Sequence, residues 1–463
     1  MHPSTSCPDP GRRIGTEDPK DVIDLEHIEE EEKAIGCIED ARAVAGDAHF
    51  HRLGWKRLTV VLIVQSIALG TLSIPSAFAS LGMVAGVVIT VALGLLAIYA
   101  SYIVGLLKLK YPHIPHYADF GRLLLGSPGD WLFSSIFVAQ LTLVVGSHCV
   151  TGKLALAAIS DSAVCSLILG AISAVILFML AIPPSFAELA VLGYIDFASI
   201  AIAVGIAIIA TGLQRDEIVA LPWSAWPKDN LTLGEAFVAI STIVFAYAFA
   251  AAQPSFMDEM HSPQDFGSSI FVLGTVQITV YTVTGALIYA FVGQTVQSPA
   301  LLSIGPLLSK VSFGIALPVI FISGSINTTV ACRFMHGRVF QHSITRYVNT
   351  AAGWATWLGL VAALTVLSWV ISEAIPFFSE LLSLSGCLFV SGFSFYLPPL
   401  LWFFLLKEGS CFEKQNFQSA VLNLLVFAVG VCVLGFGTYA SVKQIMVQFE
   451  AGSVGRPFSC SSG

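Results

Sequence analysis

Few residues of this 463-residue sequence could take part in proton chemistry within its long apolar segments. Asp196 lies in the segment 189–212, and His148 and Lys153 lie in the segment 131–156. Charging a carboxyl or imidazole group away from water is costly, so such residues are usually paired or functional. We therefore consider Asp196 and His148 as candidates for binding and releasing a proton within the apolar segments. The alternative is structural: Asp196 would reach the lipid headgroups or a basic partner, and His148 would only pack.

No residues have the spacing of a catalytic or metal site. The nine cysteines form no CxxC motif, and we expect them to be small apolar residues. His113, His116 and Asp119 lie close together, but Pro112 and Pro115 break the helical spacing that metal ligands need. The sequence therefore predicts neither an enzyme nor a bound metal or cofactor.

Two apolar segments contain residues that would expose backbone groups instead. Gly70 and Pro75 disfavour a continuous helix in the segment 58–80, and Pro254 does so in the segment 235–257. An unwound turn exposes N–H groups, which attract a carboxylate, and C=O groups, which attract a cation or an ammonium group. An α-amino acid carries both charges about one helical turn apart and would suit such a site. The alternative is a proline kink that binds nothing.

The elements that must position these residues are membrane helices. The sequence is 56% hydrophobic and only 11% charged, against roughly 25% charged in soluble domains. Eleven segments reach or approach the length of about 20 apolar residues that crosses a bilayer. They run at 58–80, 83–107, 131–156, 163–182, 189–212, 235–257, 268–293, 312–332, 353–373, 379–406 and 418–442. The predicted fold is therefore an all-α integral membrane protein with eleven transmembrane helices.

The two interruptions lie five segments apart, which is typical of inverted-repeat transporters. We predict a 5+5 inverted repeat, with one copy at 58–212 and the other at 235–406, followed by the eleventh helix at 418–442. Together they form a transporter domain at 51–445 with a short C-terminal tail at 446–463. Asp258 and Glu259, at the end of the sixth segment, could close a gate by pairing with bases after the eighth segment. The alternative is that they form a hydrated helix end.

The net charge of −8 belongs to an N-terminal tail. Residues 1–50 hold thirteen acidic and five basic residues, whereas the rest of the chain holds seventeen of each. No basic surface is present for nucleic acid. We predict a disordered acidic cytoplasmic tail, with Lys20 and Lys33 available to trafficking or ubiquitination machinery, although a tail without partners is an equal alternative.

Lysine and arginine placement favours a cytoplasmic N-terminus. Eleven helices then put the C-terminus on the opposite side, where the sequon Asn230-Leu231-Thr232 would also lie.

The first segment also resembles a known family. It contains Leu69-Gly70-Thr71-Leu72-Ser73-Ile74-Pro75-Ser76-Ala77-Phe78, followed by Leu81-Gly82-Met83-Val84-Ala85-Gly86. This stretch is similar to the first helix of the amino acid/auxin permease family, and is nearest to fungal neutral amino acid permeases of the methyltryptophan-resistance type. The resemblance covers roughly residues 50–445. It is supported by Tyr117-Ala118-Asp119, by Gln253-Pro254-Ser255-Phe256 and by the stretch from Arg333 to Phe340.

The resemblance implies the amino acid–polyamine–organocation fold and proton-coupled symport of neutral amino acids, with aromatic ones as a candidate subset, by alternating access. It implies backbone groups that hold the substrate carboxylate at Ala68, Leu69, Gly70 and Thr71. The substrate ammonium and side chain would lie against Phe245, Ala246, Tyr247 and Ala248. The pocket wall would be Gln140, Leu141 and Val144, and candidate ion-coupling residues are Ser325, Asn327, Thr328 and Thr329.

Two other functions remain open on the same fold. A vacuolar or other endomembrane exporter would move amino acids out of an acidic lumen, and a non-transporting sensor would bind them without moving them. We favour a plasma-membrane symporter whose partners are a neutral amino acid, a proton and the lipid bilayer. The sequence does not distinguish proton from sodium coupling.

Overall fold

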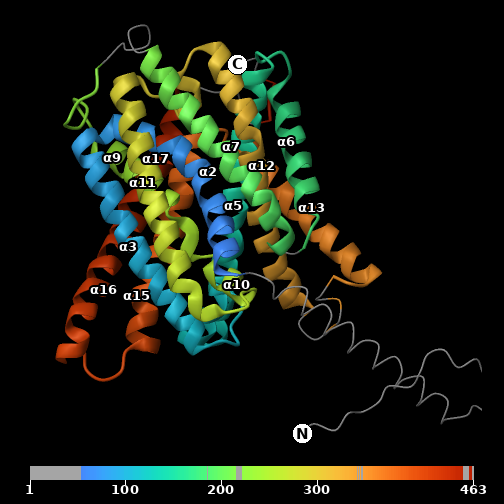
Figure 1. The fold of residues 1–463 in the computed structure, drawn as a ribbon, viewed down its shortest axis with the longest axis vertical. Coiled ribbons are helices and arrows are strands. Elements are labelled where there is room, and N and C mark those ends of the chain that lie inside the picture. Colours follow the sequence, from blue (N-terminus) through green and yellow to red (C-terminus); the bar gives the residue numbers. More distant parts are fainter. Residues whose placement is uncertain are drawn as a thin grey trace, which may run out of the picture.

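The chain folds into a bundle of helices, seen in a computed structural model (Figure 1). The structure describes residues 54–184, 186–214, 222–340, 343, 345, 348–451 and 458–460. The acidic tail predicted at 1–50 lies outside the described residues. Within the described ranges every regular element is helical and there is no strand.

The long helices follow the predicted apolar segments closely. They are α2 (Trp55–Leu81), α3 (Met83–Lys110), α5 (Ser127–Ile159), α6 (Ser166–Leu180), α7 (Phe186–Leu213), α9 (Leu233–Ala246), α11 (Phe266–Val292), α12 (Pro306–Val339), α13 (Ala351–Ala374) and α16 (Lys414–Cys432). Shorter helices are α4 (Phe120–Leu125), α10 (Gln253–Asp258), α14 (Phe378–Ser385), α15 (Leu397–Leu401) and α17 (Thr438–Glu450). Turns of 3₁₀-helix include η1 (Tyr117–Asp119) and η2 (Ala248–Ala250), and π-helical turns include η7 (Gly386–Val390), η8 (Gly392–Tyr396), η9 (Trp402–Leu406) and η10 (Val433–Gly437).

The number of spans agrees only in part with the prediction. Among the described residues, eight helices are long and apolar enough to cross a membrane, and α2 makes a ninth if its two bent halves are one span. The apolar helices α6 and α9 are shorter, with 15 and 14 residues. The last span runs from Lys414 to Glu450, past the predicted end at 442. The structure is therefore that of a multi-pass helical membrane protein, while eleven spans and the inverted repeat remain predictions.

The first span is bent, but not where the sequence predicted. α2 is helical through both Gly70 and Pro75, and its two halves meet at 41° between Val64 and Ser66. The unwound turn predicted at Gly70 to Pro75 is therefore wrong in its position. Proline removes one backbone donor from this helix, but the chain around it remains helical.

The sixth predicted segment is interrupted, as expected. α9 ends at Ala246, the backbone leaves helical geometry at Tyr247 (φ −100°, ψ 37°), and α10 begins only at Gln253. We call residues 233–258 the interrupted segment. Pro254 lies in the first turn of α10, where its missing N–H costs nothing. The proline therefore starts the second half instead of breaking the first.

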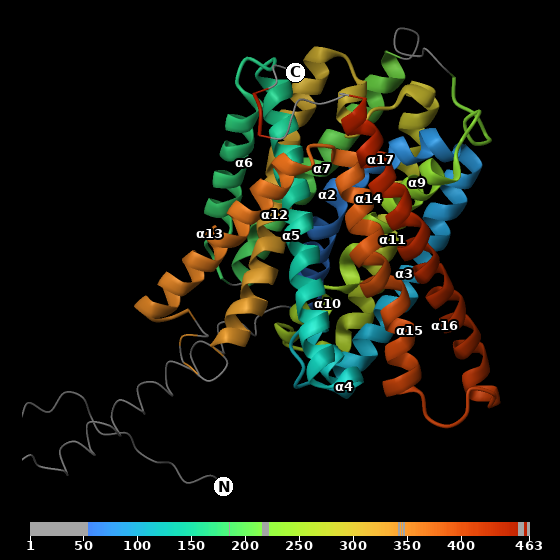
Figure 2. The ribbon, with the colours of Figure 1, turned by 180° about the vertical axis from the view of Figure 1, so that it is seen from behind.

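The bundle has a buried centre and an apolar outer surface. α2 packs against α7, α9, α11 and α12, while α12 packs mainly against α5 and α7. α6 and α13 form one edge of the bundle, and α15 and α16 form the opposite edge (Figures 1 and 2). Large apolar side chains such as Val88, Leu95 and Leu213 are exposed on the outside, which is the surface a lipid-embedded bundle requires.

One pair of cysteines corrects the prediction that they are small apolar residues. Cys165, just before α6, forms a disulfide with Cys460, 295 residues later in the chain. Neither residue lies in a cysteine motif, so their pairing depends on the fold. Cys149, Cys332 and Cys387 do fit the prediction, because they are free and buried.

Candidate functional site

A small cavity lies where α2, α5, α12 and the interrupted segment meet. Six of the predicted substrate-binding residues line it: Leu69, Gln140, Leu141, Val144, Phe245 and Ala248. Two of the predicted ion-coupling residues, His148 and Asn327, line it as well. Ser66, Ala251 and Ala252 also contribute and were missed, because neither alanine nor a hydroxyl in an apolar run carries a local signal.

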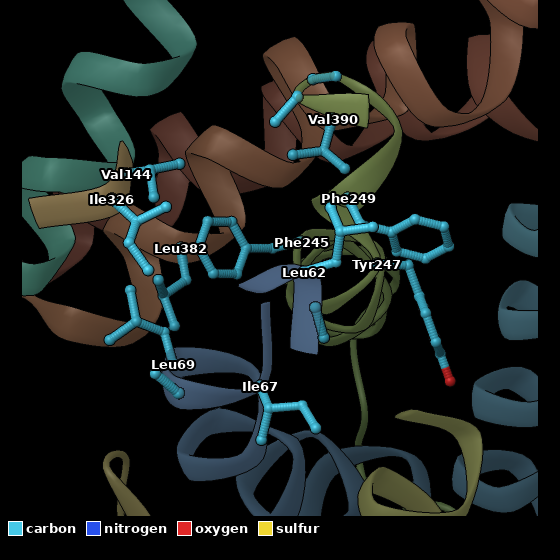
Figure 3. Close-up of a cluster of buried hydrophobic side chains, with 14 of the residues drawn as sticks. Leu62, Ile67, Leu69, Val144, Phe245, Tyr247, Phe249, Ile326, Leu382 and Val390 are labelled. Carbon is cyan, nitrogen blue, oxygen red and sulfur yellow. The ribbon is translucent and has the colours of Figure 1, made fainter. Parts of the chain in front are cut away.

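Two aromatic side chains at the break in the interrupted segment, Phe245 and Tyr247, point in different directions (Figure 3). The Phe245 ring points toward Leu382, on the side of Leu69 and Val144, whereas the Tyr247 side chain points away from them (Figure 3). The Tyr247 hydroxyl donates to the carbonyl oxygen of Thr90 in α3, at 2.9 Å. Phe245 is therefore a wall of the cavity, and Tyr247 anchors the interruption to a neighbouring helix.

The other predicted residues of α2 and the interrupted segment are buried but are not among those that line the cavity. Ala68 is fully buried, and the Thr71 hydroxyl donates to the carbonyl oxygen of Ile67 in its own helix. A Cβ atom on Gly70 would lie 2.9 Å from the Cβ of Ala246, so these two residues pack directly against each other.

Two of the three hydroxyls predicted on α12 donate to carbonyls of their own helix. Ser325 donates to the carbonyl oxygen of Ile322 at 2.7 Å, and Thr328 donates to that of Gly324 at 3.0 Å. The buried Thr329 hydroxyl has no hydrogen-bond partner in the described chain. Asn327 donates to the carbonyl oxygen of Ser323.

Two polar atoms in the cavity lining lack partners. Oε1 of Gln140 and Nδ1 of His148 are buried and make no hydrogen bond within the described residues. The other ring nitrogen of His148, Nε2, lies 3.4 Å from the Ser323 hydroxyl. Gln140 and His148 are eight residues apart on α5, so they lie on one helical face. Buried polar atoms without partners are rare in folded proteins, which makes this face of α5 a natural ligand contact.

Asp196 lies outside the cavity. It is 0% exposed, and neither of its carboxyl oxygens has a hydrogen-bond partner among the described residues. One helical turn further along α7, Ser199 donates to the carbonyl oxygen of Ile315 in α12. Asp196 is therefore buried within the bundle, and it pairs with no base in the described part of the chain.

Lys153, in contrast, has a partner. Its Nζ lies 3.0 Å from Oε1 of Glu373 in α13, and both side chains are buried. The two residues are 220 positions apart, so the sequence could not pair them. This ion pair ties α5 to α13 and neutralises both charges inside the bundle.

Ion pairs also hold α10 in place at the end of the bundle away from the disulfide. Asp258 pairs with Lys108 of α3 at 2.7 Å, and Glu259 pairs with Arg333 of α12. The pairing predicted for Asp258 and Glu259 with bases after the eighth segment therefore holds for Glu259 only.

Arg338 forms a second link at the same end. It pairs with Asp119 at 3.3 Å and with Asp130. Burial raises the pKa of the Asp119 carboxyl, and the Arg338 guanidinium opposes that rise. In the parts of the chain that are described, no three His, Cys, Asp or Glu residues are placed to hold a metal ion.

The cavity is closed in this conformation. It measures about 20 Å³, room for about one water molecule, whereas small-molecule sites usually measure roughly 300–1,000 Å³. Its walls must therefore move apart before anything larger than water can bind.

Comparison with known proteins identifies the relatives of this chain. A family profile described as "Transmembrane amino acid transporter protein" matches residues 51–443. The "N amino acid transport system protein" of Neurospora crassa is 53% identical, with 94% of each chain covered. A "Transmembrane transporter" of Fusarium pseudograminearum is 28% identical, over 89% of this chain and 88% of the other. "Amino acid transporter AVT1J" of Arabidopsis thaliana is 23% identical, over 82% and 88%.

Proposed function

Because the chain belongs to the transmembrane amino acid transporter family, we propose that it is a proton-coupled symporter of neutral amino acids, aromatic ones included. It works by alternating access, with the cavity opening to one side of the membrane at a time. The relative in Neurospora crassa, whose name refers to an amino acid transport system, supports this class of substrate.

The lining of the cavity is the observation that carries the proposal. Among the described residues its lining includes no Asp, Glu, Lys or Arg, and Leu69, Val144 and Phe245 give it apolar surfaces beside the polar Gln140 and Asn327. A charged substrate side chain would be left without a partner in this environment, at high cost. The interrupted segment beside the cavity supplies backbone N–H and C=O groups that suit the charges of a zwitterion. An uncharged side chain on an α-amino acid is the best match.

The buried acid on α7 supports proton coupling. An isolated carboxylate inside a membrane protein is costly, so Asp196, which has no hydrogen-bond partner among the described residues, is a favourable place to take up a proton. His148 lines the cavity itself and provides a second titratable group next to the substrate. Ser325, Asn327, Thr328 and Thr329 are the groups on α12 that would support a proton path between them.

The disulfide supports the proposed orientation. Cys165 and Cys460 join the α5–α6 connection to the C-terminal segment, at the end of the bundle opposite α4 and α10 (Figure 2). Disulfides form in oxidising compartments, so we place this end outside the cytoplasm. The N-terminus is then cytoplasmic, and we propose the plasma membrane as the location.

Transport by the purified protein tests the proposal. The full chain is reconstituted in liposomes, an inward proton gradient is imposed, and uptake of labelled phenylalanine and leucine is measured with and without sodium. We expect uptake that depends on the proton gradient and not on sodium, with little uptake of labelled arginine or glutamate. Binding without uptake would support a sensor instead, and gradient-independent uptake would contradict symport.

A variant of the buried acid tests the coupling residue separately. Asp196→Asn should abolish accumulation driven by the proton gradient but keep exchange of labelled for unlabelled phenylalanine across the membrane. Glu380→Gln is the matched control, because Glu380 is also buried but accepts a hydrogen bond from Gln448. Gradient-driven accumulation by Asp196→Asn at the wild-type level would exclude Asp196 as the proton carrier.

A further inference from the structure

Three helices meet at the hydroxyl group of Tyr281, a fully buried residue of α11. The hydroxyl oxygen lies 2.9 Å from the carbonyl oxygen of Ser66 in α2. It also lies 3.0 Å from the carbonyl oxygen of Ala246 at the end of α9. A single side chain therefore contacts the backbone of both the bent span and the interrupted segment.

The positions of these two carbonyls are specific. Ser66 is the first residue after the bend in α2, and Ala246 is the last residue of α9 before the interruption. The last carbonyls of a helix have no partner within it and must be satisfied from outside. A phenol has one hydrogen, and neither carbonyl can donate, so the O–H of Tyr281 is shared between two acceptors.

Gly70 allows this junction to form. A Cβ atom on Gly70 would lie 2.7 Å from the hydroxyl oxygen of Tyr281 and 2.9 Å from the Cβ of Ala246. Both distances are shorter than side chains tolerate, so α2 can approach this point only without a side chain. This close approach gives Gly70 a role that does not require an unwound turn.

The same junction borders the cavity. Ser66 lines the cavity, and so does Phe245, the residue directly before Ala246. Moving either bonded carbonyl would therefore move a wall of the cavity. Tyr281 itself is not among the lining residues, so it acts on the cavity through the backbone of its two partners.

We propose that Tyr281 is a positioning residue that holds the bent α2 and the interrupted segment together and so sets the shape of the substrate cavity between them. This inference rests on the proposed transport function for its kinetic consequence only. Its structural consequence, a tighter backbone at the interruption, is independent of what the protein transports.

The test compares two tyrosines of α11. Tyr281→Phe removes the shared hydroxyl. Tyr289→Phe is the matched control, because Tyr289 is equally buried in the same helix, but its hydroxyl accepts from the N–H of Ser224 in a loop between α7 and α9. In reconstituted liposomes we expect Tyr281→Phe to raise the KM for labelled phenylalanine about tenfold, the effect of one lost buried hydrogen bond. The maximal rate should change much less, and Tyr289→Phe should leave KM unchanged.

Hydrogen exchange of the purified full chain gives a readout that does not need transport. We expect the backbone amides of residues 245–252 to exchange faster in Tyr281→Phe than in the wild type or in Tyr289→Phe. Unchanged exchange there, or an equal rise in both variants, would overturn the inference. If the wild type transports phenylalanine, an unchanged KM in Tyr281→Phe would also overturn the inference. If the wild type transports neither phenylalanine nor leucine, the proposed function fails, and the exchange experiment alone decides the role of Tyr281.

Discussion

The first span and the interrupted segment respond to helix-breaking residues in opposite ways. α2 contains both Gly70 and Pro75, yet it stays helical and bends at a different place, between Val64 and Ser66. The α-helix of the interrupted segment ends at Ala246 and resumes at Gln253, and the run between them, which includes the 3₁₀-helical turn η2, contains neither glycine nor proline. Alanine is the best helix former, so local propensity does not explain where the chain unwinds.

Hydrogen bonds from other helices explain better where the α-helix is interrupted. In α2 the hydroxyls of Thr71 and Ser73 donate to carbonyls of the same helix. In the interrupted segment, the Ala246 carbonyl accepts from Tyr281 of α11, and the Tyr247 carbonyl accepts from Ser394 of η8. A backbone group freed from a helix must find another partner. The interruption is therefore stable where neighbouring helices provide donors, and this difference can be tested at three sites.

The largest effect is expected in α2. Gly70→Leu places a side chain where a Cβ atom alone would come within 2.9 Å of both Tyr281 and Ala246, so the junction between α2 and the interrupted segment must separate. We expect uptake of labelled phenylalanine to fall by about a hundredfold or more, while protein remains in the membrane.

The control is Gly205→Leu in α7, where a Cβ atom would meet nothing within 4 Å. Uptake and membrane levels of this variant should match the wild type. Normal transport by Gly70→Leu would show that the close approach of the two segments is dispensable.

An intermediate effect is expected at Glu259, the residue directly after the interrupted segment. Glu259→Gln removes the carboxylate that pairs with Arg333, and the loss of one charge from a buried ion pair costs about 3 kcal/mol. α10 should then separate from α12 more often. Cys332 is fully buried beside Arg333, so its reaction with a maleimide, followed by mass spectrometry, should become faster.

Two internal comparisons support that measurement. Cys411, in the loop before α16, is free and partly exposed, and it should react at the same rate in every variant. Glu235→Gln changes the first turn of α9, at the start of the interrupted segment. The ion pair of Glu235 with Lys228 is partly exposed there, so it contributes little to stability. Equal labelling of Cys332 in the wild type and Glu259→Gln would mean that the ion pair does not hold α10 closed.

The smallest effect separates two serine hydroxyls. Ser394→Ala removes the donor to the Tyr247 carbonyl, at 3.0 Å from another helix, whereas Ser76→Ala removes a bond to Ser73 within α2. We expect the first to lower the free energy of unfolding by about 1 kcal/mol, because a buried acceptor loses its partner. The second should have a much smaller effect. Thermal unfolding in detergent measures both, and equal values would contradict a special need for outside donors at the interruption.

Much of the architecture follows from the amino-acid sequence. Segments such as 83–107 and 353–373 match α3 and α13 within a few residues, because a helix is the only open-chain structure that satisfies its own backbone in lipid. Eight of the predicted site residues line one cavity, since the family resemblance places the same helices around it. The length of an apolar segment and the family motif in the first helix are local properties of the sequence, so both can be recognised without the tertiary structure.

The contacts that complete the site could not be predicted from the sequence. The disulfide of Cys165 with Cys460, the ion pair of Lys153 with Glu373, and the hydrogen bond of Tyr281 with Ser66 join residues that are more than 200 positions apart. Each contact depends on which faces of distant helices pack together, and the amino-acid composition does not determine that packing. The bend in α2 and the break in the α-helix at Tyr247 depend on these contacts between distant helices. A backbone group can leave an α-helix only where another part of the chain forms a hydrogen bond with it.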